Sequence, residues 1–98
     1  MLILEVLGGP FDGTTWEFEQ EIVIGRDESV AGACLPLDRF VSRKHARVRR
    51  DGDGLILTDL SSRNGTRVGG RVVSSETAVS IGEPFVVGRT QLRVIERG

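Results

Sequence analysis

Apolar and polar side chains alternate with a period of two in several short runs of the chain. In Thr15–Glu19 the two aromatic residues fall on one face and the two acids on the other, and Arg47–Arg49 and Leu92–Val94 alternate in the same way. Successive side chains of a β-strand point to opposite faces, so these runs predict strands with one buried and one solvated face. Leu2–Leu7 and Ile22–Ile24 are more continuously apolar, which favours central strands.

Turn signals that contain glycine separate these runs about every ten residues. They lie at residues 8–10, 12–13, 51–54, 64–65, 69–70 and 82–84. Short strands between closely spaced turns are typical of an all-β sandwich or barrel. The strongest helix candidate is the apolar stripe of Leu37, Phe40 and Val41, which ends at Lys44. We therefore expect no helix longer than one or two turns.

The composition indicates a single domain. The chain has 98 residues, 39% of them apolar, which is enough for one packed core. We expect this domain to cover residues 1–98, with its two terminal strands side by side. The apolar runs are too short to cross a bilayer, and Glu5 interrupts any secretory signal, so a cytoplasmic chain with no membrane interaction is expected. Cys34 is the only cysteine, which excludes an internal disulfide, and no metal or cofactor is expected.

Basic residues gather in the middle of the chain, although the net charge is only −1. Residues 1–38 hold eight acids and one base, whereas residues 39–71 hold nine bases and three acids. Twelve of the thirteen bases are arginine, whose planar guanidinium can pair with two oxygens of a phosphate or carboxylate. The middle segment therefore suggests an anionic ligand. Arginines on strands, such as Arg47 and Arg49, are expected instead to form a solvated face.

Three polar segments lie at predicted strand ends. Ile24–Arg26 closes an apolar strand, Val41–Ala46 precedes a strand, and Asp59–Thr66 lies between a strand and a hairpin. All three could occupy loops at one edge of a sandwich, where a rigid scaffold can hold binding groups. The side chains that they would bring together are Arg26, Ser42, Arg43, Arg63 and Asn64.

These side chains suit a phosphate group. Three guanidiniums, a hydroxyl and an amide would face three acceptor oxygens and a charge of about −1.5 to −2. The amide of Asn64 could also pair with the main chain of an extended peptide beside the phosphate. In that case the ligand would be a phosphopeptide rather than free phosphate.

The three segments together resemble the forkhead-associated (FHA) domain. The family pattern is Gly-Arg, then Ser-x-x-His, then Asn-Gly followed by threonine. It corresponds here to Gly25-Arg26, Ser42 to His45, and Asn64-Gly65-Thr66. The resemblance covers nearly the whole chain, with its motif region at residues 24–70. It implies an FHA-like β-sandwich of about eleven short strands in two sheets, without significant helix, that binds phosphothreonine in Ser/Thr kinase signalling.

The resemblance also implies roles for the matching residues. The phosphothreonine-binding residues would be Arg26, Ser42, Arg43, Arg63 and Asn64, the last of them on the peptide backbone. The loop-supporting residues would be Gly25, His45, Gly65 and Thr66. His45 would hold Ser42 in place, and the glycines would permit backbone shapes that a Cβ disfavours. A small apolar contact would accept the threonine methyl and so favour phosphothreonine over phosphoserine.

The implied partner is a threonine-phosphorylated protein or peptide, itself a substrate of a Ser/Thr protein kinase, bound by a monomer. Specificity would come from the residues beside the phosphothreonine, and Arg39, Phe40 and Arg63 are our candidates for reading them. Asp27 and Glu28 follow Arg26 and would repel a phosphate if they faced the site. We therefore expect both carboxylates to point away from it.

Other functions fit the sequence less well. Ser42, His45 and Asp59 supply the residue types of a hydrolase triad, but no nucleophile elbow surrounds the serine, and no paired carboxylates or Gly-rich loop before a helix are present. We therefore do not expect an enzyme. Few aromatic residues and the absence of a recognition helix disfavour a nucleic-acid binder. The remaining alternative is a structural module that binds an unphosphorylated partner.

Overall fold

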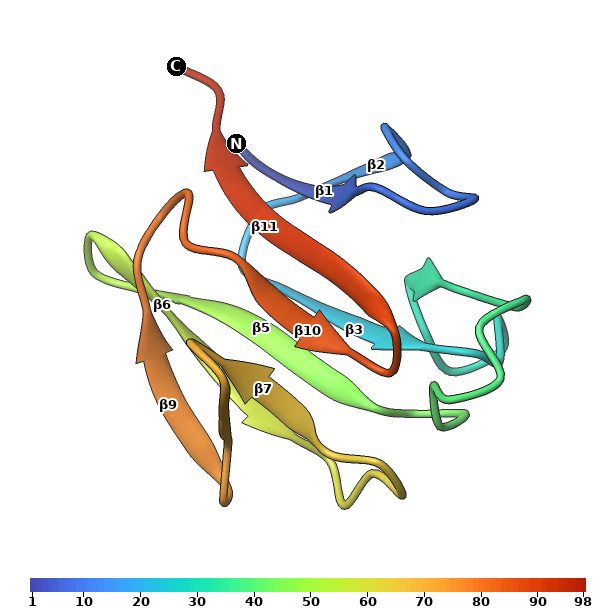
Figure 1. Cartoon of the computed structure of the whole chain (residues 1–98). Coiled ribbons are helices and arrows are strands. Elements are labelled where there is room, and N and C mark those ends of the chain that lie inside the picture. The colour runs from blue at the N-terminus through green and yellow to red at the C-terminus, as the bar shows by residue number, and fades with distance from the viewer.

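Two sheets of short strands pack against each other to form a sandwich (Figure 1), seen in a computed structural model that describes residues 1–98. The six-stranded sheet has the order β2-β1-β11-β10-β7-β8, and the five-stranded sheet has the order β4-β3-β5-β6-β9. The first sheet consists of β1 (Leu2–Leu7), β2 (Thr15–Phe18), β7 (Thr66–Val68), β8 (Arg71–Val72), β10 (Phe85–Val87) and β11 (Thr90–Glu96). The second consists of β3 (Glu21–Gly25), β4 (Ala33–Cys34), β5 (Ala46–Asp51), β6 (Gly54–Asp59) and β9 (Glu76–Val79). The predicted all-β sandwich of eleven strands is confirmed, and the structure contains no helix.

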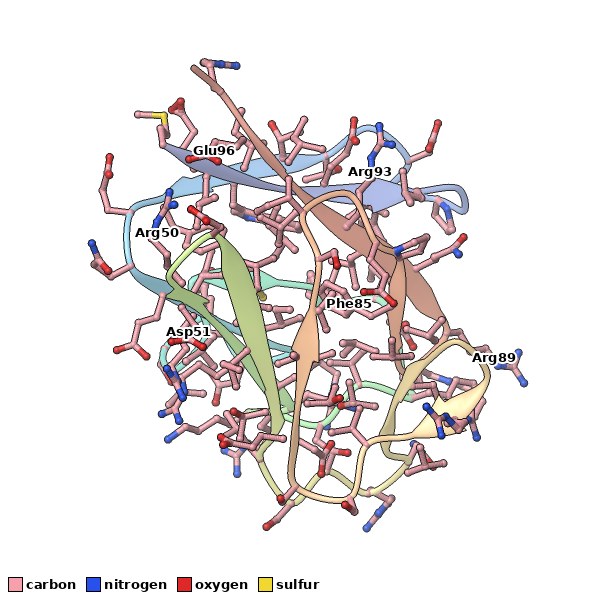
Figure 2. All side chains as sticks on the ribbon, turned by 90° about the vertical axis from the view of Figure 1, so that its left-hand side faces the viewer. Arg50, Asp51, Phe85, Arg89, Arg93 and Glu96 are labelled. Carbon is pink, nitrogen blue, oxygen red and sulfur yellow. The ribbon has the colours of Figure 1, made fainter.

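The core lies between the two sheets and is built from alternating strand positions. In β1, Leu2, Leu4 and Val6 are buried, whereas Glu5 lies on the opposite face and pairs with Arg93 of β11 at 2.8 Å. Nineteen buried apolar residues form one cluster, which includes the fully enclosed Phe85 (Figure 2). Each fully buried Val, Leu or Phe side chain stabilises the fold by roughly 1.5–3 kcal/mol relative to its exposed form. Burial of these apolar side chains is therefore what favours the alternating strand pattern.

The first and last strands are neighbours. β1 and β11 pair antiparallel along their whole shared length, from Leu2 opposite Glu96 to Leu7 opposite Gln91. The expectation that the terminal strands lie side by side is confirmed, and Figure 1 shows both ends of the chain on the same side of the sandwich. The structure contains no helix long and apolar enough to span a membrane.

The strand register brings the three polar segments to one end of the sandwich. Ile24 at the end of β3 lies opposite Ala46 at the start of β5, and Ala46 lies opposite Asp59 at the end of β6. In the other sheet, Val87 lies opposite both Thr66 and Thr90. The loops after β3, before β5 and after β6 therefore share one end with the β10–β11 turn. We call this the loop end.

The candidate helical stripe forms turns at the loop end. Leu37 and Phe40 lie in two successive turns, and Val41 is buried whereas Leu37 is largely exposed. The carboxylate of Asp38 accepts the backbone N–H of Phe40 at 3.0 Å. A bond of this kind offers the backbone an alternative to helical hydrogen bonds. The apolar spacing alone therefore did not produce a helix here.

Candidate functional site

All five side chains expected to contact a ligand line one hollow at the loop end. The hollow has a volume of about 240 Å³. It is lined by Arg26, Arg39, Phe40, Val41, Ser42, Arg43, Arg63 and Asn64. Four of these eight residues are arginine and none is acidic, so the hollow is suited to an anion. Residues nearly 40 positions apart in the sequence thus converge as the motif spacing suggested.

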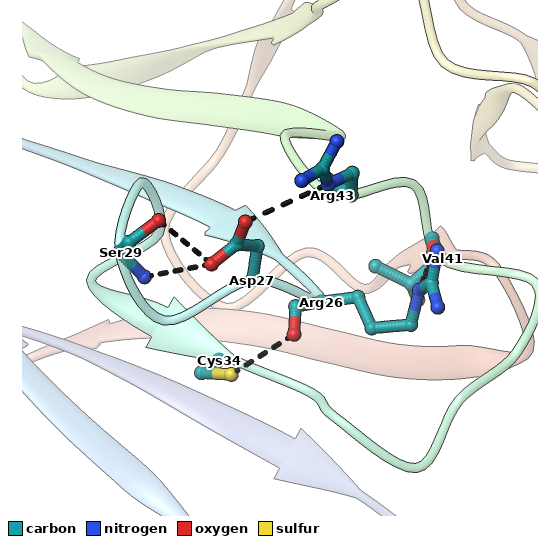
Figure 3. Close-up of polar contacts among 6 residues, drawn as sticks. All are labelled: Arg26, Asp27, Ser29, Cys34, Val41 and Arg43. Atoms are coloured by element: carbon teal, nitrogen blue, oxygen red, sulfur yellow. Dashed lines mark hydrogen bonds and ion pairs between the residues drawn. The ribbon is translucent and has the colours of Figure 1, made fainter.

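Arg26 is held at the rim by its backbone and by one nitrogen of its guanidinium. Its Nε donates to the carbonyl of Val41 at 3.1 Å (Figure 3). Its backbone N–H donates to the carbonyl of Ser42 at 3.0 Å. The two terminal nitrogens of the guanidinium donate to no other group of the protein. They remain available as the paired donors that a phosphate or carboxylate requires.

Gly25 allows the chain before Arg26 to pass very close to the loop that carries Ser42. A Cβ at Gly25 would lie 2.1 Å from the carbonyl oxygen of Arg43, far inside van der Waals contact. Gly25 does not have a left-handed φ, unlike Gly65, whose φ is +83°. A Cβ is therefore disfavoured at both glycines, at Gly65 by its left-handed φ. At Gly25 the constraint is instead the close approach of the loop backbone at Arg43.

His45 is fully buried and joins two of the loops. Its Nδ1 accepts the backbone N–H of Ser42 at 2.9 Å, which makes the ring neutral with its proton on Nε2. That Nε2–H donates to the carbonyl of Gly65 at 2.8 Å. Both ring nitrogens thus bond to backbone, and neither reaches the hydroxyl of Ser42. The ring therefore links the loop that carries Ser42 to the loop that carries Gly65.

The hydroxyl of Ser42 and the amide of Asn64 are each anchored through one atom. Ser42 Oγ accepts the backbone N–H of Arg63 at 2.9 Å, so its own hydrogen is left free to donate to a ligand. Asn64 Nδ2 donates to the carbonyl of Phe40 at 2.9 Å, which leaves its Oδ1 free to accept a bond. Each side chain therefore has a fixed position and an unused hydrogen-bonding group.

Asp59 organises the loop that carries Arg63 and Asn64. Its Oδ1 accepts the hydroxyls of Ser62 at 2.5 Å and Thr66 at 2.7 Å, and its Oδ2 accepts the backbone N–H of Ser62 at 3.1 Å. Burial alone would raise the pKa of Asp59. The hydrogen bonds from Ser62 and Thr66 outweigh that effect and hold the pKa below its ordinary value of 3.8. Asp59 and Thr66 are therefore loop supports, and Asp59 is bonded to these hydroxyls rather than to His45.

The lowered pKa of Asp59 predicts how the stability of the variant Asp59→Asn depends on pH. The ionised carboxylate stabilises the fold above the unfolded-state pKa near 3.9, and this contribution is lost as pH falls through the lower folded-state pKa. The variant should be less stable than wild type at pH 7, and this difference in the free energy of unfolding should shrink below about pH 4. Urea unfolding at several pH values measures it, with Asp53→Asn in the exposed β5–β6 turn as the control. A difference that stays constant down to pH 3 would contradict the assignment.

Arg43, unlike Arg26, makes no side-chain hydrogen bond within the protein. Its side chain is 78% exposed and its Nε lies 3.6 Å from Asp27 Oδ2 (Figure 3). Asp27 is itself held by Ser29, whose N–H and hydroxyl donate to Oδ1 at 2.9 and 2.8 Å, and these bonds lower the pKa of Asp27. Neither Asp27 nor Glu28 lines the hollow, although Asp27 lies beside Arg43. A ligand that recruits Arg43 must compete with this carboxylate.

Sequence reasoning missed Asp38, which is buried at the loop end and receives three hydrogen bonds. One signal was available, since an aspartate two residues before a turn residue often accepts that residue's N–H. Its other two donors lie about fifty positions away along the chain, at Arg89 and Thr90. No local pattern could indicate them.

Comparison with known proteins gives a consistent family match. The model of the FHA domain family matches residues 22–88. The FHA domain-containing protein FhaB of Mycobacterium tuberculosis is 32% identical over 76 residues, which is 78% of this chain and 48% of that protein. The chain thus spans about half the length of this curated relative.

Solved structures of FHA domains superpose over the whole chain. The FHA domain of the CT664 protein from Chlamydia trachomatis is 25% identical with a TM-score of 0.89, covering 99% of this chain and 98% of that one. An FHA domain solved in a study of phosphothreonine-dependent interactions is 32% identical with a TM-score of 0.83, covering 99% and 97%. The match therefore includes both the motif region and the β-sandwich around it.

Proposed function

This chain belongs to the forkhead-associated family, and from that membership we propose that it binds phosphothreonine in a partner protein. The observation that carries the proposal is the arginine-rich hollow. Arg26 and Ser42 both line it and have hydrogen-bond donors that no protein group uses, and no acidic residue lines it. A phosphate dianion presents three acceptor oxygens and needs such a convergent set of donors.

The roles follow from which atoms remain free. The terminal nitrogens of Arg26 and the hydroxyl of Ser42 bind the phosphate, and Arg43 and Arg63 add charge from more exposed positions. Asn64 uses its free Oδ1 to accept a backbone N–H of the bound peptide. Each charge-assisted hydrogen bond of this kind contributes roughly 1.5–3 kcal/mol. The site is a binding site, and none of its residues is proposed to catalyse a reaction.

The partner in this proposal is a protein phosphorylated on threonine by a Ser/Thr kinase and bound by a single copy of the domain. A second hollow of about 380 Å³ adjoins the phosphate hollow and shares Arg39 and Phe40 with it. It contains the exposed side chain of Leu37, and the guanidinium of Arg89 lies 4.0 Å from the centre of the Phe40 ring. We propose that this hollow receives a side chain of the peptide beside the phosphothreonine, which is how the chain would distinguish partners.

Phe40, the exposed apolar residue of the phosphate hollow, offers a contact for the methyl group of threonine. Burial of one methyl group is worth about 0.8 kcal/mol, so a phosphothreonine peptide should bind about fourfold more tightly than the matching phosphoserine peptide. A degenerate phosphothreonine peptide library first identifies a binding sequence. Titration calorimetry then compares that sequence in its phosphothreonine, phosphoserine and unphosphorylated forms.

The unphosphorylated peptide is the control and should show no measurable binding. Equal binding of the phosphorylated and unphosphorylated forms would overturn the proposed function and favour the structural module. Equal binding of phosphothreonine and phosphoserine would overturn only the methyl contact. Selection for apolar residues at one flanking position in the library would support the role of the second hollow, and a flat profile would contradict it.

A further inference from the structure

Asp38 is a buried carboxylate whose charge is matched by hydrogen bonds alone. It is 9% exposed and forms no salt bridge. Its Oδ1 accepts the backbone N–H of Phe40 at 3.0 Å, and its Oδ2 accepts the backbone N–H of Arg89 at 2.9 Å and the hydroxyl of Thr90 at 2.6 Å. An aspartate is seldom buried without strong compensation, so three converging donors indicate a constrained position.

These bonds fasten the segment of residues 36–41 to the β10–β11 turn. The turn presses closely on the segment, because a Cβ at Gly88 would lie 2.6 Å from Val41 Cγ2 and 3.0 Å from Asp38 Oδ2. The backbone carbonyl of Asp38 also accepts the N–H of Val41 at 3.1 Å. Asp38 therefore closes the Asp38–Val41 turn through its backbone and bonds through its side chain to Thr90 of β11, in the six-stranded sheet.

The two carbonyls next along this segment hold the ligand-binding side chains. The carbonyl of Phe40 accepts Asn64 Nδ2 at 2.9 Å, and the carbonyl of Val41 accepts Arg26 Nε at 3.1 Å. A shift of residues 40–41 would therefore move the anchors of Arg26 and Asn64 at the same time. Errors of about 1 Å in such groups are enough to weaken a site strongly.

We propose that Asp38 is the positioning residue of the phosphopeptide site: it fixes the Phe40 and Val41 carbonyls against the β10–β11 turn and so presets Arg26 and Asn64. This inference rests on the proposed function for its effect on affinity. The positioning itself concerns the protein without ligand and can be measured there.

The test uses Asp38→Asn, which keeps the shape of the side chain. An amide offers only one oxygen and its NH2 group cannot accept, so either the Phe40 N–H or the Arg89 N–H must lose its acceptor. Affinity for the selected phosphothreonine peptide should fall about tenfold. The control is Val79→Ala in β9, at the other end of the sandwich, which removes buried apolar volume without touching the loop end. It should lower thermal stability and leave affinity unchanged within twofold.

A double-mutant cycle distinguishes positioning of Asn64 by Asp38 from a general loss of stability. If Asp38 acts through Asn64, the effects of Asp38→Asn and Asn64→Ala on binding should overlap, and the double variant should be weaker than wild type by less than the product of the single losses. Fully multiplicative losses, or unchanged affinity in folded Asp38→Asn, would overturn the inference.

Measurements on the free protein distinguish failure of the inference from failure of the proposed function. NMR should show the Asn64 side-chain amide and the Arg26 Nε–H losing protection from exchange in Asp38→Asn but not in Val79→Ala. Unchanged protection would refute the positioning role, whether or not any phosphopeptide binds. Absence of peptide binding by wild type would refute the proposed function instead.

A second approach applies if Asp38→Asn does not fold. Asp38→Ser keeps a hydroxyl that can accept the Phe40 N–H but cannot reach Thr90, and it should show the same loss of protection. In the unmutated protein, the Phe40 and Arg89 amides and the Asn64 side-chain amide should open together in hydrogen exchange. Independent opening of these groups would also overturn the inference.

Discussion

Replacing Arg26 with alanine is expected to weaken phosphothreonine-peptide binding by at least about a hundredfold. The substitution removes two guanidinium nitrogens that have no other partner in the protein. Two charge-assisted hydrogen bonds at roughly 1.5–3 kcal/mol each correspond to a loss of this size or more. The fold should survive, because Arg26 contributes one side-chain bond to the protein and lies at the rim. Titration calorimetry with the selected peptide measures the loss.

Two matched variants show whether the geometry or only the charge of Arg26 is required. Arg26→Lys keeps the charge but not the planar fork, and should bind about tenfold more weakly than wild type. Arg49→Ala removes an arginine from the outer face of the five-stranded sheet, away from the hollow, and should bind as wild type does. Binding by Arg26→Ala within threefold of wild type would rule out the hollow as the phosphate site.

The second large effect is expected at Gly25. Substitution by alanine would place a Cβ 2.1 Å from the Arg43 carbonyl oxygen and 3.2 Å from the Ala31 Cβ. Neither backbone can yield easily, because the Arg26 N–H and the Asp27 N–H donate to the carbonyls of the Ser42–Arg43 loop. Overpacking of this severity costs about 3 kcal/mol or more of folding stability. Separation of the two loops should also move Arg26 away from Ser42 and abolish measurable peptide binding.

Gly54→Ala is the matched control for this substitution. Gly54 begins β6 without a left-handed φ, and its added Cβ would meet its nearest neighbour at 3.7 Å, an ordinary contact. The free energy of unfolding of the Gly54→Ala variant should stay within about 0.5 kcal/mol of wild type. Urea unfolding compares the two variants with wild type. A Gly25→Ala protein as stable as Gly54→Ala would mean that the loops do not approach as closely as the structure indicates.

Alternation and turn signals predicted the fold because they depend only on neighbouring residues. The run from Thr15 to Glu19 contains β2, and Leu2–Leu7 is the central strand β1. The apolar stripe of Leu37, Phe40 and Val41 was the strongest helix candidate, but it forms turns, where the Asp38 side chain accepts the Phe40 N–H. The candidate site was also accessible from the sequence, because its motif residues lie at strand ends and the register brings those ends together.

The sequence by itself determined the strand pattern, the order of the three motif segments and the types of side chain that a phosphate requires. The tertiary structure alone decided which backbones nearly touch, as at Gly25 and the Arg43 carbonyl, and which distant donors meet, as at Asp38 and Thr90. It also placed Asp27 beside Arg43, outside the lining of the hollow. The physical reason is that such contacts join residues whose separation along the chain carries no periodic signal. They exist only once both sheets have packed and their loops share one end.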